Sequence, residues 1–266
     1  METRSVGLWM FPVDAVRDRA KLASAVLRYY DESGAKPDTM TIDGERFAHR
    51  AFKPAAYRAA MSDPSVRSIA LWSQQDDSVA VVRCVLRWFD PQDREFDSLS
   101  VTLISMRSPF AMAPTLRAFV GALVNLYPVA QGFVGGFRSH VYANKECLLA
   151  TYSPLDLDED TRARLKLDNR HLRLDVLSKT LRRLYPVTII GPGIWSRLPP
   201  MPKVEHPPVI EDLGDCKMIT AWPDLVEPRD PAFLAGTVEL RRWLWPFTLQ
   251  NPADAVELDS TAPRPR

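Results

Sequence analysis

The chain has 266 residues, of which 46% are hydrophobic and 25% are charged. This composition is typical of a folded globular protein and excludes a wholly disordered one. The 34 basic and 33 acidic side chains nearly balance, which argues against a dedicated nucleic-acid-binding protein, because such proteins carry a clear basic excess.

The cysteines and the N-terminus indicate the compartment. Cys84, Cys147 and Cys216 lie far apart and form no Cys-x-x-Cys pair, which favours reduced thiols over a disulfide framework. The first residues contain too short an apolar segment for a signal peptide, and no apolar run approaches the length that spans a bilayer. We therefore expect a cytoplasmic protein without membrane contact.

Proline is the unusual residue, with 23 copies against 11 glycines. Proline fixes φ and removes a donor, so its excess predicts stiff connections between elements. Stiff loops suit a preshaped binding surface, and they suit a stable scaffold equally well.

The first part of the chain predicts alternating strands and helices. Apolar runs predict short strands, and three- and four-residue apolar spacing predicts helices. Asp14 is the expected N-cap of the first helix, Gly34 follows its end, and Pro54 stands in the first turn of the second. The expected order is a strand at 6–11, a helix from 14 to 34, a strand at 39–42, an Asp43-Gly44 turn and a helix at 52–61.

A three-stranded meander is expected next, over residues 68–73, 79–89 and 99–106, because short polar turns separate runs with strand character. A helix at 113–127 follows, with one apolar face that suits packing on the sheet. That face consists of Leu116, Phe119, Val120, Leu123 and Val124.

The later part of the chain predicts helices at 154–168 and 172–185, with 143–151 left unassigned between strand and helix. A β-branched strand at 187–190 breaks at Gly191-Pro192-Gly193, and after a polar link a second strand ends at Trp222. Asp230 and Pro231 predict the start of a helix that runs through Trp245.

Together these elements predict an α+β fold, in which helices pack mainly on one face of an antiparallel or mixed sheet. Length alone allows one domain or two, and we expect a single domain over residues 1–250. The last residues, 251–266, contain three prolines and predict a flexible tail.

Several motifs resemble sites that carry chemistry. Residues 131–136 are glycine-rich but do not match a phosphate-binding order, so a glycine-permitted bend is the favoured interpretation. Asp156, Asp158 and Asp160 have calcium-loop spacing without its glycine and glutamate, which favours the first turn of a helix. The four histidines are scattered, and Ser139-His140 lacks a hydrolase motif. We assign no catalytic residue, metal or cofactor.

Tryptophan and arginine gather in the last third of the chain. These two residue types are enriched at the centres of protein interfaces. Helical spacing cannot place Trp243 and Trp245 on one face, so at least one of them is expected to meet solvent or a partner. The alternative is that the tryptophans cover the core where the helix at 230–245 lies on the sheet. The candidate partner-binding residues are Trp195, Arg197, Trp222, Arg242, Trp243 and Trp245.

The segment 185–199, Tyr-Pro-Val-Thr-Ile-Ile-Gly-Pro-Gly-Ile-Trp-Ser-Arg-Leu-Pro, carries a family resemblance. With the following strand and the Trp-rich helix, it resembles bacterial immunity proteins of type VI secretion and other polymorphic toxin systems. The resemblance implies a cytosolic protein that binds and neutralises one cognate toxin or effector, with no catalysis of its own. The charge balance and the absence of a long apolar run add the expectation of no nucleic-acid and no membrane partner. Oligomeric state is left open.

A different class remains as the alternative. An acyl- or nucleotidyl-transfer enzyme would use the glycine-rich stretch at 131–140 to hold its coenzyme or nucleotide.

Overall fold

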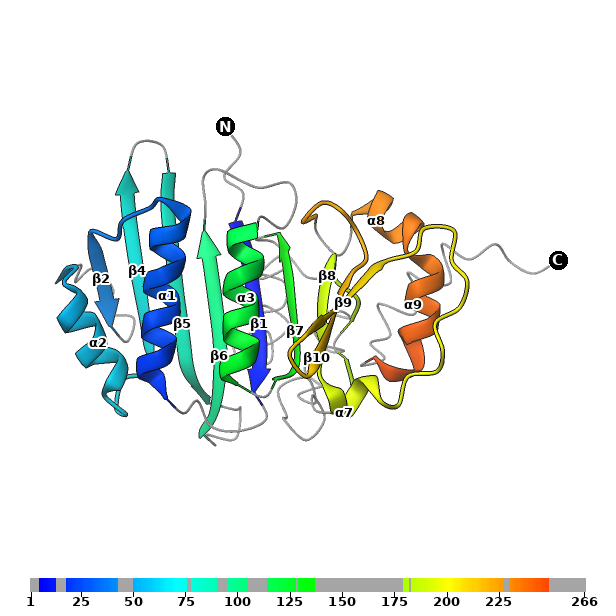
Figure 1. Cartoon of the computed structure of the whole chain (residues 1–266), viewed down its shortest axis with the longest axis horizontal. Coiled ribbons are helices and arrows are strands. Elements are labelled where there is room, and N and C mark those ends of the chain that lie inside the picture. The colour runs from blue at the N-terminus through cyan, green and yellow to red at the C-terminus, as the bar shows by residue number, and fades with distance from the viewer. Residues whose placement is uncertain are drawn as a thin grey trace, which may run out of the picture.

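The computed structural model describes residues 5–12, 18–42, 50–75, 78–89, 95–104, 114–127, 129–136, 179–181, 183–226 and 230–248. These residues form an α+β fold built on one large sheet, with helices on its faces (Figure 1). Within these ranges, no helix combines the length and the apolar character that crossing a membrane requires.

Ten strands form the sheet, in the order β3-β2-β4-β5-β6-β1-β7-β8-β10-β9, and each neighbouring pair is antiparallel. The fold class expected from the sequence is therefore confirmed. The strands are β1 (Ser5–Pro12), β2 (Thr39–Ile42), β3 (Arg50–Ala51), β4 (Ser68–Gln75), β5 (Ser78–Phe89), β6 (Glu95–Ile104), β7 (Val129–Gly136), β8 (Val187–Ile190), β9 (Val209–Leu213) and β10 (Cys216–Thr220).

The predicted meander is confirmed, because β4 pairs with β5 and β5 with β6. β6 begins at Glu95, four residues before the expected start, and the early residues Glu95, Phe96 and Asp97 pair with the end of β5. Their mixed polarity does not predict a strand, since an alternation of apolar side chains is the usual signal.

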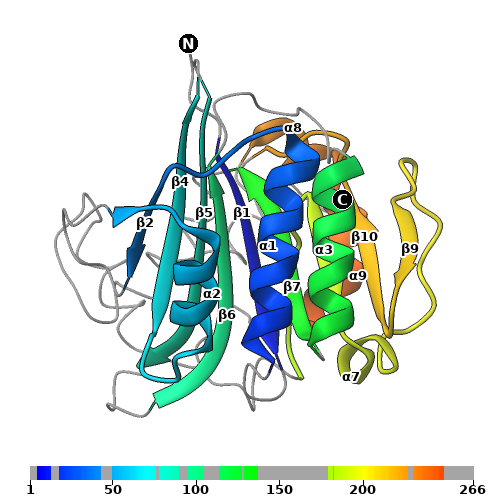
Figure 2. The ribbon, with the colours of Figure 1, turned by 60° about the vertical axis from the view of Figure 1, so that its left-hand side comes forward.

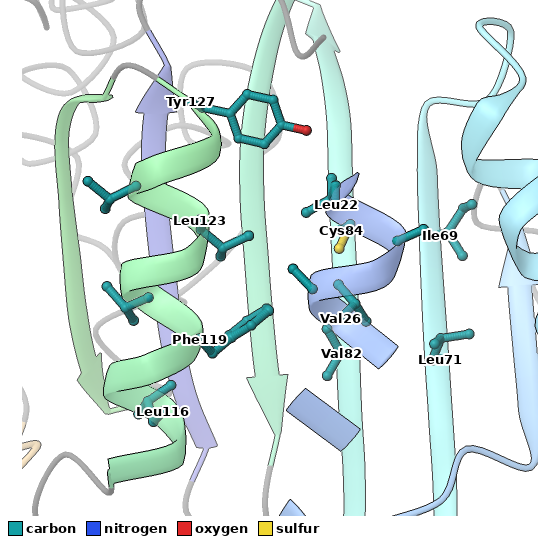
Figure 3. Packing of buried hydrophobic residues seen from close by; sticks show 14 of the residues in the cluster. Leu22, Val26, Ile69, Leu71, Val82, Cys84, Leu116, Phe119, Leu123 and Tyr127 are labelled. Carbon is teal, nitrogen blue, oxygen red and sulfur yellow. The ribbon is translucent and has the colours of Figure 1, made fainter. Parts of the chain in front are cut away.

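Helices α1 (Arg19–Ser33) and α3 (Pro114–Leu126) lie side by side across one face of the sheet (Figures 1 and 2). All five apolar residues predicted for the α3 face are buried. Figure 3 shows how side chains from α3, such as Phe119 and Leu123, and from α1, such as Leu22 and Val26, point toward the strands between them. Burial of this apolar surface is the main stabilising contribution to the fold.

The N-cap of α1 differs from the expectation. Asp18, not Asp14, caps the helix, and its carboxylate accepts the Lys21 N–H at 3.3 Å. Both residues are short acids just ahead of the apolar period, so spacing alone could not separate them. Gly34 ends the helix with φ 72°, as predicted, because this left-handed conformation favours glycine.

Helix α2 (Pro54–Ser62) flanks the β2–β3 end of the sheet and begins with proline at its first position, as predicted (Figure 2). Tyr57 and Met61 are buried against the same core as α1 and α3, while the outer side of α2 is exposed.

The structure corrects the expectation for the glycine-rich stretch. Residues 131–136 were expected to form a bend, but they belong to β7, an interior strand paired with β1 on one side and β8 on the other. The apolar residues Phe133 and Val134 are adjacent and lie among glycines, so the stretch lacks the two-residue period that predicts a strand.

The C-terminal third adds a second layer on the other face of β8 and β10. Its elements are α7 (Pro192–Trp195), α8 (Pro231–Gly236), α9 (Val238–Leu244) and the short helix η2 (Trp245–Phe247). Val187, Ile189 and Met218 face the α1–α3 core, whereas Ile190 and Ile219 face α8 and α9. β8 and β10 therefore separate two hydrophobic clusters.

Three expectations in this third need correction. The helix predicted to end at residue 185 is not helical over 179–181 and 183–185. The polar link before β10 contains a further strand, β9. The helix predicted from 230 to 245 is divided at Thr237 into α8 and α9, although its cap is confirmed, since Asp230 accepts the N–H groups of Ala232 and Phe233.

Some predictions fall outside the described residues. They are the Asp14 position, the Asp43-Gly44 turn, the segment 143–151, the helix at 154–168 with its three aspartates, Ser139-His140, Cys147 and the tail 251–266.

Candidate functional site

Three of the six candidate residues, Trp195, Trp222 and Trp243, belong to the second hydrophobic cluster or pack against it. This cluster consists of Leu181, Leu184, Ile190, Ile194, Ile219, Phe233, Leu240, Trp243 and Leu244, with Trp195 and Trp222 packed against it. We call the outer side of this cluster, formed by α7, α9 and the segment between α7 and β9, the Trp–Arg surface.

α7 is held tightly against the sheet. The N–H of Gly191 donates to the Ala130 carbonyl at 2.9 Å, and a Cβ at Gly191 would lie 2.2 Å from the Val129 oxygen. Only glycine allows this approach. Pro192 then opens the short helix, which places Trp195 half-buried at the edge of the cluster.

Trp195 and Arg197 are braced by neighbours. The Lys217 ammonium lies 5.9 Å from the centre of the Trp195 ring, within range of a cation–π contact. Arg197 is exposed, but its Nε donates to the Gly193 carbonyl at 3.0 Å and its Nη2 donates to the Lys179 carbonyl. Its guanidinium is therefore held in place by two backbone carbonyls.

Trp222 lies at the other end of the β8–β10 ladder from Trp195, because Trp222 follows β10 and Trp195 follows β8, its antiparallel neighbour. Its ring meets Phe233 edge to face, with centroids 6.1 Å apart. Gly236 leaves the space that this ring fills, since a Cβ there would lie 2.3 Å from Trp222 Cζ3. Trp222 is thus a half-buried wedge and does not join the Trp195 group.

The three residues near the end of α9 differ in exposure. Trp243 is only 9% exposed, and its Nε1 donates to the Pro199 carbonyl at 3.1 Å. Trp245 is half-buried and Arg242 is exposed. At least one of Trp243 and Trp245 was expected to meet solvent or a partner, and Trp245 is partly exposed to solvent. Trp243 joins α9 to the segment after α7 through Pro199.

Sequence reasoning missed Lys217 and Asp212. They face each other across β10 and β9 and form an ion pair beside Trp195. The alternation of Lys217 with Met218 was a usable signal for Lys217, but the pairing depends on a strand that the sequence pattern did not predict.

The groups with strongly shifted acidity lie elsewhere, under α1, α2 and α3. Burial raises the pKa of Cys84 to about 12 and raises the pKa of Tyr57 well above its ordinary value. Burial also raises the pKa of Cys216 to about 11. These groups stay neutral at physiological pH and serve packing. Over the described ranges, no three metal-ligating side chains gather into a candidate site.

The glycine-rich segment does not form a phosphate cradle within its described part. Backbone groups of residues 131–134 face the ladders with β1 and β8, and the Gln131 side chain donates to the Thr180 carbonyl at 2.8 Å. Phosphate binding needs several backbone N–H groups free at a loop or helix start. Residues 131–134 therefore offer no free backbone N–H groups to the coenzyme or nucleotide of the alternative enzyme hypothesis.

Comparison with protein families gives no match, and no curated protein matches the sequence. Among solved structures, the chain is similar to a Pseudomonas aeruginosa T6SS protein, PA0821, with a TM-score of 0.52 and 12% identity. The alignment covers 92% of this chain and 73% of that chain. At this identity the likeness is one of fold, and the fold is that of a protein described as a type VI secretion protein.

Proposed function

We propose that this chain is a cytoplasmic immunity protein of a type VI secretion system. It binds one cognate toxin and neutralises it through protein–protein contact, without catalysis and without a cofactor. The observation that carries the proposal is the likeness in fold to a T6SS protein over 92% of the chain. The resemblance of residues 185–199 to toxin-immunity proteins supports the same direction.

The Trp–Arg surface is the proposed contact. Arg242 is exposed and Trp245 is half-buried, so both can meet a partner directly. Large aromatic and guanidinium groups contribute most at the centres of interfaces. Trp195, which is half-buried on α7, offers further aromatic area, whereas Trp222 lies apart from this surface.

The bracing of this surface favours binding. Arg197 is tied to two backbone carbonyls, and Trp243 is tied to Pro199. Side chains and loops that are already ordered lose little conformational entropy when a partner docks, so more of the contact energy appears as affinity.

The test is co-expression with the product of the neighbouring gene. If that product arrests growth when it is expressed alone, we expect the present chain to restore growth and to co-purify with it as a complex, while an empty vector does neither. Unrestored growth together with separate elution of the two proteins would count against the proposal.

A further inference from the structure

β9 forms one edge of the ten-stranded sheet, and no described strand pairs with its outer side. An open edge presents unpaired N–H and C=O groups that can extend the sheet to another strand. Proteins often block such edges with proline, but Pro207 and Pro208 precede β9 and none lies inside Val209–Leu213. Val209 is 56% exposed, more than any other large hydrophobic side chain in the described part.

The hairpin geometry shows which backbone groups face outward. Leu213 pairs with Cys216 across the two-residue loop of Gly214 and Asp215, and Gly214 has φ 59°. The pair that closes such a loop is hydrogen bonded, and hydrogen-bonded pairs alternate along an antiparallel ladder. Ile210 and Asp212 therefore direct their N–H and C=O groups away from β10.

The two acidic side chains of β9 are neutralised on both faces of the sheet. On the α3 face, Glu211 pairs with Arg117, and on the other face Asp212 pairs with Lys217. Uncompensated charges on an edge strand would discourage a second strand. Because a cation from α3 or β10 accompanies each carboxylate, this edge keeps its capacity to pair.

We propose that β9 pairs antiparallel with β9 of a second copy of this chain, so that two ten-stranded sheets join across a two-fold axis at Glu211. This inference goes beyond the proposed function and does not depend on it.

The edge is complementary to itself in this register. Ile210 of each copy lies opposite Asp212 of the other, so all four outward-facing residues exchange hydrogen bonds. Val209 lies opposite Leu213 on the α3 face, which covers the exposed valine. The two copies of Glu211 face each other between two copies of Arg117, and this gives a network of two anions and two cations.

The other sheet edge is less suited to self-pairing, because β3 has only two residues, Arg50 and Ala51. A short edge strand offers few backbone groups to a partner. The observations therefore favour β9 as the contact.

The first test is sedimentation or light scattering of the full chain from about 1 µM to about 1 mM, a range that detects weak dimers. We expect a monomer that converts to a dimer as concentration rises, since pairing one strand from each copy buries little area. A chain that stays monomeric over the whole range, or that assembles beyond a dimer, would overturn the proposal.

Variants then locate the contact. Val209→Lys should weaken the dimer about tenfold or more, because it places a charge where Leu213 of the second copy would pack. Met201→Lys is the matched control, since Met201 is also an exposed large hydrophobic side chain, at 37%, and it lies outside β9. Equal dimerisation of wild type and Val209→Lys would contradict contact through β9.

The charge network supplies an independent test of the two-fold axis. Arg117→Gln leaves two carboxylates facing each other and should weaken the dimer about tenfold, because like charges in contact repel. The double variant Arg117→Gln/Glu211→Gln removes both charges and should restore dimerisation to near the wild-type level. If Arg117 only stabilised the fold, the second substitution at Glu211 would not restore dimerisation. Failure of the rescue would exclude the proposed register.

Discussion

At the scale of single residues, some glycines are required because a neighbouring side chain fills the space that a Cβ would occupy. Gly236→Ala should destabilise the protein by about 1–3 kcal/mol, because the new Cβ would lie 2.3 Å from the Trp222 ring and force that wedge outward. The free energy of unfolding in urea measures the effect, and Trp222 fluorescence reports the displacement.

Gly121→Ala is the control for this prediction. Its Cβ would lie 3.4 Å from the tip of Leu213, and alanine stabilises a helix interior over glycine by up to about 1 kcal/mol. Unchanged stability in Gly236→Ala would show that the Trp222 ring does not fill this space.

The buried thiols give a second prediction at this scale. Cys84 and Cys216 are buried and free, and burial raises the pKa of each thiol, to about 12 and about 11. A thiol reagent at pH 8 should therefore modify neither residue in the folded protein and both in urea, because the thiolate is the reactive form. Peptide mass analysis distinguishes the two sites.

The same shifts have a consequence for stability. A raised pKa means that the folded state holds the thiol proton more tightly than the unfolded chain. The protonated thiols therefore contribute fully to the free energy of unfolding below the ordinary thiol pKa of 9.0. This contribution is lost as the pH rises toward the raised pKa of Cys216, about 11, and of Cys84, about 12. We expect the urea concentration at the unfolding midpoint to decrease as the pH is raised from 9 to 11. Rapid native labelling of either cysteine at pH 8 would contradict this account of the core.

At the scale of elements, strong local patterns predicted most of the fold. The β-branched strand β8, the alternating strand β5 and the apolar face of α3 all lie where the sequence indicated, because a β-branched run, an alternating run and three- to four-residue apolar spacing are strong local signals. β9 was missed because Glu211 and Asp212 make it look like a loop. Their cations, Arg117 and Lys217, come from other elements, so local sequence could not reveal the compensation.

For the candidate site, the sequence predicted which residue types occur but not which residues contact each other. The clustering of tryptophan and arginine in the last third drew attention to the part of the chain that forms the second hydrophobic cluster. It could not show that Trp243 binds Pro199, 44 residues away, or that Trp222 lies apart from Trp195. Such contacts arise from tertiary packing, which residue spacing within one element does not contain.

β7 gives the prediction that belongs to this scale. Its backbone is paired on both sides over residues 131–134, so it has no free N–H groups there for a phosphate. Coenzyme A, ATP and GTP should leave the melting temperature unchanged, since a ligand that binds the folded state raises it. A saturable rise with any of the three would revive the transferase hypothesis.

At the scale of the whole molecule, different helices cover the two faces of the sheet. α1, α2 and α3 cover one face and bury most of the core, while α8 and α9 cover the other face at the C-terminal end (Figures 1 and 2). The Trp–Arg surface belongs to the second group. A partner can therefore dock there without contact to the main core.

The most direct test of the central claim is the binding of this chain to the neighbouring gene product, measured by surface plasmon resonance at two salt concentrations, which gives both the affinity and the association rate. We expect Trp245→Ala to weaken binding by about 2 kcal/mol and Arg242→Glu to slow association and reduce its salt dependence. Arg58→Glu, an exposed change on α2 at the far end of the sheet, should bind like the wild type. Equal affinity of all three variants would contradict a role for the Trp–Arg surface.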